Sequence, residues 1–126
     1  MKSSFFSILL FIILVAFLTY ADISFKNLCN DIIEMCDELE DTMKAQSKEE
    51  NFETAMKIFN LLQDRGNIAS IYINHMDYDV MLTEALKLTV YIENDDISES
   101  EASLHSLKFS TTHMKELQIP DFKNIF

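Results

Sequence analysis

Apolar and polar residues alternate along most of this chain with the period of an α-helix, but near the start the apolar residues follow one another without a break. Residues 5–21 (FFSILLFIILVAFLTYA) are seventeen positions without a charge. As a helix they would cover roughly 26 Å, close to the bilayer's hydrocarbon core of about 30 Å. The pattern predicts one N-terminal membrane helix, in contact with lipid through residues 5–21, and amphipathic helices after it.

The flanks of this apolar stretch predict its orientation. Lys2 precedes it and Asp22 follows it, so the positive-inside rule places the body of the chain outside the cytoplasm. We predict a single-pass protein of the cell membrane with an extracytoplasmic C-terminal domain. The alternative is a signal peptide cleaved after Ala21, which would leave the body secreted. Tyr20 is suited to a membrane interface and favours the uncleaved anchor.

The first amphipathic segment, about residues 24–46, has apolar residues at alternating spacings of four and three. This spacing makes an a/d seam of nearly three heptads, with acidic residues at most other positions. The seam must be covered, either inside a bundle of the same chain or by a second copy in a coiled-coil homodimer. The seam residues, which are also the candidates for self-association, are Phe25, Cys29, Ile32, Cys36, Leu39 and Met43.

The next segment is predicted to be one long helix that ends before residues 74–77. Ser47 and Glu50 have the spacing of a capping box at its start. Gly66 lies within it and weakens it by about 1 kcal/mol relative to Ala. Its predicted buried stripe is Phe52, Ala55, Met56, Phe59 and Leu62.

Two further helices are predicted, over about residues 77–94 and 98–118. Ser98 and Glu101 form a second capping box at the start of the last one, and Pro120 stops it. The predicted inner stripes are Met81, Ala85, Leu88 and Ile92 in the third helix and Leu104, Leu107, Thr111, Met114 and Leu117 in the fourth.

These elements predict an all-α protein in which an N-terminal membrane helix precedes an antiparallel bundle of about four helices, built from two αα-hairpins. A single Gly and a single Pro argue against a turn-rich β fold. We divide the chain into the anchor (residues 1–21), the exported bundle (22–118) and an apolar tail (119–126). The tail either docks on the bundle or binds a partner, and its candidate partner-binding residues are Phe122, Ile125 and Phe126.

Charge narrows the possible partners. The formal net charge is −11, and all 21 acidic residues lie beyond the apolar stretch. A field of this sign repels phosphate backbones, so we expect no nucleic-acid binding. The ordinary interpretation is a solvated helical surface, and the alternative is a surface for a basic partner or for cations.

Little in the sequence indicates catalytic chemistry. Cys29 and Cys36 are seven residues apart, or about 10.5 Å along one helix, which is too far for a disulfide between them. They fit small core residues, or an intermolecular disulfide in a parallel dimer. His105 and His113 are about 12 Å apart on one helix and cannot share a metal ion. We therefore expect no cofactor, no metal site and no enzymatic activity.

Several short motifs stand out in the second half of the chain, namely His75, Tyr91-Ile92, Leu107-Lys108, His113 and Lys123-Asn124-Ile125-Phe126. With these the chain resembles a family of short clostridial and related Firmicute proteins that is catalogued as a domain of unknown function. The resemblance implies a single membrane helix, an exported acidic helical body and no assigned activity. The family's genes often lie beside a gene for a multi-spanning membrane protein, which implies an accessory role. The chain departs from the family at Phe52, where Trp is frequent, and at Gly66.

The function we predict is that of a non-catalytic accessory or protein-interaction module on the outer face of the membrane. Its partner would be another membrane or envelope protein. One alternative is a structural element that self-associates through the seam. The other is an exported domain that senses a cation or small ligand with its acidic surface and histidines.

Overall fold

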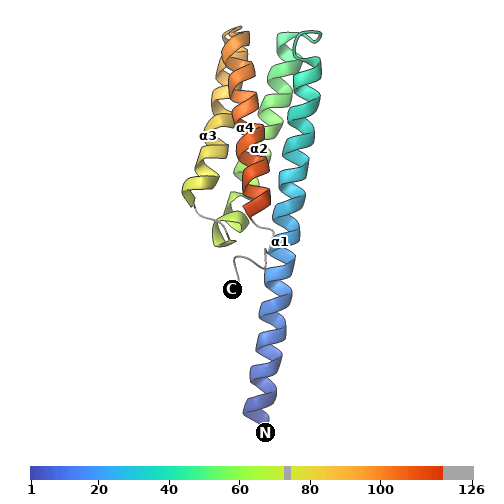
Figure 1. Cartoon of the computed structure of the whole chain (residues 1–126), viewed down its shortest axis with the longest axis vertical. Coiled ribbons are helices and arrows are strands. Elements are labelled where there is room, and N and C mark those ends of the chain that lie inside the picture. The colour runs from blue at the N-terminus through green and yellow to red at the C-terminus, as the bar shows by residue number, and fades with distance from the viewer. Residues whose placement is uncertain (73–74, 118–126) are drawn as a thin grey trace.

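The computed structural model describes residues 1–72 and 75–117, with the backbone alone for residues 67–72 (Figure 1). All regular structure in these ranges is helical, which confirms the all-α prediction. The helices are α1 (Lys2–Thr42), α2 (Lys48–Tyr72), α3 (His75–Glu93) and α4 (Ile97–Leu117). Neighbouring helices run antiparallel, and α4 closes the bundle by packing against α1.

The bundle has four corners. Each helix contacts the helix before and after it, and no contacts between the described residues join α1 to α3 or α2 to α4, so these pairs lie diagonally across from each other. The α1–α2 and α3–α4 turns lie together at one end, and α1 projects beyond the bundle at the other end (Figure 1). The architecture is an up-down-up-down bundle of two αα-hairpins.

The apolar stretch and the first bundle helix are one uninterrupted helix. α1 has 41 residues, and all of its residues up to Tyr20 are exposed. Burial begins at Ala21 and continues at Phe25, so no linker separates the apolar part from the bundle. Within the described residues, α1 is the one helix long and apolar enough to cross a membrane, as an anchor or a signal sequence would be. It ends at Thr42, before the predicted end near residue 46.

The seam of α1 packs inside its own chain. All six seam residues are buried in the core, together with Leu28. The predicted inner stripe of α3 is also buried, and so are the first four positions predicted for α4. Leu117 is the exception in α4. It is the last residue of the helix, and its side chain is exposed.

The buried stripe of α2 differs from the prediction. Asn51, Ala55, Ile58 and Leu62 are buried, at spacings of four, three and four. Phe52 and Phe59, predicted to be central, are only half-buried at the edge of the core. Met56 is half-buried as well. The stripe is therefore rotated toward Ile58, because a heptad seam admits one side chain per turn at its centre and leaves large neighbours on its flanks.

The two predicted capping boxes have different outcomes. The backbone N–H of Glu50 donates to the Ser47 hydroxyl at 3.3 Å, so Ser47 caps α2 as predicted. At α4 the prediction is wrong, because Asp96 is the cap and accepts from the N–H of Glu99 at 3.2 Å. Ser98 lies inside the first turn of α4. Asp96 competes well for this role, since its carboxylate also suits the positive end of the helix dipole.

Gly66 lies within a continuous α2, as predicted, and faces an aromatic ring of α3. The ring of Tyr78 on α3 comes so close that a Cβ at position 66 would lie 3.4 Å from its Cε1 atom. The Tyr78 hydroxyl donates a hydrogen bond to the carbonyl of Leu62, one turn before Gly66. A Cβ at position 66 would thus make ordinary van der Waals contact with the ring, so the packing of Tyr78 does not require glycine there.

Candidate functional site

The outward face of α1 carries an acidic ridge, which consists of Asp31, Glu34, Glu38 and Asp41. These four residues are spaced by three, four and three positions, so they form one line on the side of α1 opposite the seam. All four are exposed. Carboxylates at these spacings repel each other along the helix, so the acidic character of the chain is most concentrated at this corner of the bundle.

The outward face of α3 has a different character. Val80, Leu86 and Val90 are exposed there, on the side opposite the buried stripe of α3, and Met76 extends the same face toward the start of the helix. We call these four residues the α3 apolar face. The apolar residues form two neighbouring pairs, Met76 with Val80 and Leu86 with Val90. Exposed polar residues lie on the same side of the helix, namely Asp79, Thr83 and Lys87. Because α1 and α3 are diagonal, this face and the acidic ridge point in opposite directions.

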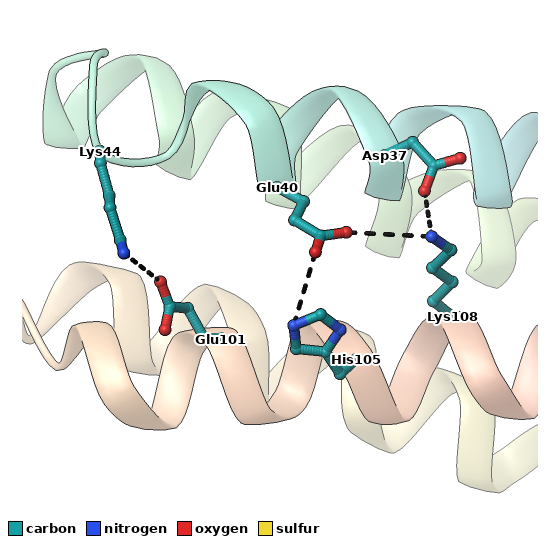
Figure 2. Close-up of polar contacts among 6 residues, drawn as sticks. All are labelled: Asp37, Glu40, Lys44, Glu101, His105 and Lys108. Atoms are coloured by element: carbon teal, nitrogen blue, oxygen red, sulfur yellow. Dashed lines mark ion pairs between the residues drawn. The ribbon is translucent and has the colours of Figure 1, made fainter.

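Between α1 and α4 lies a row of charged contacts, which we call the charged ladder. It consists of Asp37, Glu40 and Lys44 on the α1 side and Glu101, His105 and Lys108 on α4 (Figure 2). Lys44 lies 3.4 Å from Glu101, at the end where the turns are. Glu40 lies 3.6 Å from the Nε2 atom of His105, and this pair is ionic only when His105 is protonated.

Lys108 is the residue of the ladder with two acidic partners. Its ammonium forms an ion pair with Asp37 and lies 3.9 Å from Glu40. The hydrogen bond with Asp37 raises the pKa of Lys108 above its ordinary value. All of these side chains are at least one-third exposed, so each pair contributes at most about 1 kcal/mol. The ladder joins α4 to α1 along their length.

The two cysteines lie in the core of the bundle and are not bonded to each other. Neither has measurable exposure. Burial raises the pKa of both Cys29 and Cys36 to about 12. Since the thiolate is the reactive form, both are packed as inert small core residues.

The three histidines do not come together. His105 belongs to the charged ladder, and the ring of His113 stacks on Phe109 with the centroids 6.1 Å apart. His75 is exposed at the start of α3. Among the described residues, no group of three His, Cys, Asp or Glu side chains could hold a metal ion.

The structure places the two predicted interaction elements differently. The seam from Phe25 to Met43 is covered by the chain's own helices, so a homodimer through it would require the bundle to open. Phe122, Ile125 and Phe126 lie outside the described residues. The sequence analysis missed the α3 apolar face, although Val80 and Val90 stand out as large apolar residues outside the predicted inner stripe of α3.

By its fold, the protein is a small helical bundle that continues directly from an apolar N-terminal helix. The chain belongs to the family described as a domain of unknown function (DUF4363), whose model matches residues 19–125. This match confirms the resemblance to a domain-of-unknown-function family, and it covers the whole bundle. No curated protein and no solved structure matches the chain.

Proposed function

We propose that this chain is a single-pass membrane protein that holds its bundle on the extracytoplasmic side as a non-catalytic accessory module. There it binds another membrane or envelope protein. The observation that carries this proposal is α1, which joins an exposed apolar segment to a folded core in one helix. A bundle fixed in this way stays next to the membrane, where a membrane-bound partner is within reach.

Retention of the apolar segment is supported by the geometry around Ala21. The alternative cleavage position lies in the middle of α1, with regular helix on both sides. Ala21 is itself buried, and Lys26 forms a salt bridge of 2.8 Å to Asp22 one turn later. Nearby, Arg65 of α2 donates to the Ser24 hydroxyl at 3.4 Å, which ties α2 to the same region. These two contacts lie beyond residue 21, so the support for retention comes from the continuous helix and from the burial of Ala21.

Partner binding is supported by the α3 apolar face. The exposed fractions of Val80, Leu86 and Val90 lie between 44 and 49%, whereas other apolar side chains of α3 are buried in the core. A strongly acidic chain needs no exposed valines to remain soluble. We therefore assign the partner surface to α3 and regard the acidic ridge on α1 as the solvated side.

Topology can be tested by labelling with a membrane-impermeant maleimide in intact cells. The variants Ser3→Cys and Glu34→Cys each place a reactive thiol on one side of the apolar segment. The unmodified chain is the blank, because its Cys29 and Cys36 are buried. We expect Glu34→Cys to be labelled, and Ser3→Cys to be protected until the membrane is permeabilised. Labelled Ser3→Cys in intact cells, or a released product lacking residues 1–21, would contradict the anchored topology.

The partner surface can be tested with a photo-crosslinking amino acid at Val90, with Glu34 on the opposite corner as the matched control. We expect a discrete adduct with one membrane or envelope protein from position 90 in native membranes, and none from position 34. The same adducts from both positions, an adduct only with a second copy of the chain, or no adduct at all would contradict the proposal.

A further inference from the structure

The end of the bundle at which α2 ends and α3 begins lies beside the apolar part of α1 (Figure 1). Two contacts set the height of α2 along α1: Asn51 donates to the carbonyl of Met43 at 2.8 Å, and Arg65 donates to Ser24 at 3.4 Å. The backbone of α2 ends at Tyr72, 21 residues beyond Asn51 and seven beyond Arg65. Counting the same steps back along the antiparallel α1, from Met43 and from Ser24, leads to positions 22 and 17. The bundle therefore extends to the height at which the apolar stretch ends.

The sequence at this end of the bundle is free of charge. Residues 66–76 (GNIASIYINHM) are eleven positions without Asp, Glu, Lys or Arg, bounded by Arg65 and Asp77. Beyond residue 21, no other such run exceeds six positions. In α1, Asp22 forms its salt bridge with Lys26 at 2.8 Å. The acidic character that would repel anionic headgroups elsewhere on the chain is thus interrupted where the bundle meets the apolar stretch.

The start of α3 places an exposed apolar side chain close to this height. Met76 is 75% exposed, more than any other large apolar side chain described beyond residue 21. Two residues later, Tyr78 packs on α2 between Leu62 and Gly66, so Met76 lies at about the height of Gly66. The same count along α1 puts Gly66 level with residues 23–28, which is about 3–10 Å beyond residue 21.

That height corresponds to the interfacial layer of a bilayer. The layer between hydrocarbon and water is about 5–8 Å thick on each side of the membrane. Helical side chains lean toward the N-terminus of their helix, and the N-terminus of α3 is its end nearest the apolar stretch. Met76, the second residue of α3, therefore leans toward the bilayer. On the diagonal corner, Ile23 of α1 is 53% exposed directly after Asp22.

We infer that the bundle itself contacts lipid, and that the end at which α2 ends and α3 begins lies in the interfacial layer with Met76 and Ile23 at the headgroup–acyl boundary. Apolar side chains on a polar domain are stabilised at this depth. Lipid is the occupant because the unbroken α1 brings the bilayer to this height whether or not a partner is bound. The inference rests on the proposed function, since it requires the retained anchor. It assigns Met76 to lipid and leaves the rest of the α3 apolar face to the partner.

The test uses single tryptophans as depth reporters, because the chain contains no tryptophan of its own. The full chain is placed in phosphatidylcholine vesicles with bromine on the acyl chains near the headgroups, where bromine quenches tryptophan on contact. Met76→Trp is the probe. Val90→Trp is the matched control, on the same face of α3 but 14 residues, or about 21 Å, farther along. Phe17→Trp, within the apolar stretch, reports insertion of the anchor.

We expect Met76→Trp and Phe17→Trp to emit at shorter wavelength and to lose intensity in brominated vesicles, and Val90→Trp to emit equally in brominated and plain vesicles. Because no other protein is present, quenching at position 76 identifies lipid as the contact. Quenching at position 17 without quenching at 76 would overturn the inference and leave the anchor intact. Equal quenching at 76 and 90 would also overturn it, because α3 would then lie along the membrane. No quenching at position 17 would refute the proposed anchor, and the inference with it.

Discussion

α1 and α3 stand at opposite corners of the bundle and are alike on the inside and unlike on the outside. Both bury a stripe of side chains at heptad spacing, with Ile32 and Met81 fully covered. Outside, α1 carries the acidic ridge and α3 carries the α3 apolar face. The inner pattern determines that the chain folds as a bundle, and the outer patterns distinguish the two surfaces that the proposed partner would meet.

The comparison also shows that the charged residues are unevenly distributed among the helices, which the net charge of the chain does not reveal. Residues 22–42 hold seven acidic residues and one lysine, whereas residues 75–93 hold four acidic residues and one lysine. A formal charge of −11 suggests a uniformly acidic surface, but the charge is concentrated on one helix. The outward side of α3 is therefore less acidic than that of α1.

The largest effects are expected where the two helices are alike. Ile32→Ala and Met81→Ala should each lower the free energy of unfolding by about 2–5 kcal/mol, through lost burial and a residual cavity. Glu34→Ala and Val80→Ala, on the outer faces of the same helices, should change it by no more than about 0.5 kcal/mol. Urea unfolding of the full chain in detergent measures all four. Equal tolerance of Ile32→Ala and Glu34→Ala would show that the seam is not packed inside the chain.

Alkaline pH tests the interior of both helices together. Burial raises the pKa of Cys29 and Cys36 on α1, and of Tyr78 on α3, to about 12. The folded state thus holds these protons more tightly than the unfolded state. The associated stability is fully present below pH 9 and declines as the pH rises toward 12, by up to a few kcal/mol.

The measurement for this second prediction is urea unfolding at a series of pH values. Tyr78→Phe should cost about 1 kcal/mol near neutral pH, because the hydrogen bond to Leu62 is lost. The free energy of unfolding of this variant should decline less steeply above pH 10 than that of the unmodified chain. A wild-type stability that stays constant up to pH 12 would contradict the burial of these groups.

A smaller gain is expected where α3 rests on α2. Gly66→Ala should stabilise the protein by up to about 1 kcal/mol, because Ala favours the helix and its Cβ reaches only ordinary contact distance from the Tyr78 ring. Gly66→Val should lose this gain, since its extra methyl groups would press against that ring. Thermal unfolding of the two variants distinguishes them. Destabilisation by Ala would mean that Tyr78 packs more tightly than described.

The smallest effect separates the outer faces. Glu38→Lys replaces repulsion of Glu34 and Asp41 by attraction, so it should stabilise the protein by about 0.5 kcal/mol at low salt. The gain should fade in about 1 M salt as screening increases. Thr83→Lys on the outward side of α3 is the control and should have no comparable effect. A salt-independent change at position 38 would show that the ridge residues do more than repel each other.

The sequence predicts the four helices and most of the core because heptad spacing reports directly on burial. It fails where the answer depends on the geometry of a turn or on residues far apart in the chain. Ser98 and Asp96 are both good caps, and the choice depends on a turn in which Asp95 adopts a φ of 58°. Asn51 is buried because a carbonyl at the end of α1 needs its amide. Tyr78 is buried against α2, where its hydroxyl donates to the carbonyl of Leu62, and neither helix alone indicates this.

In the proposed anchored topology, the continuity of α1 also sets how the bundle is oriented around the membrane normal. A helix advances by about 100° per residue, so the number of residues between the bilayer and Phe25 sets the azimuth of the α3 apolar face. One alanine inserted after Tyr20 would turn the whole bundle by about 100° without altering its core. Seven inserted residues would restore the azimuth to within about 20° while raising the bundle by about 10.5 Å. In this topology, the number of residues in the apolar part of α1 sets the direction in which the bundle faces a partner at the membrane.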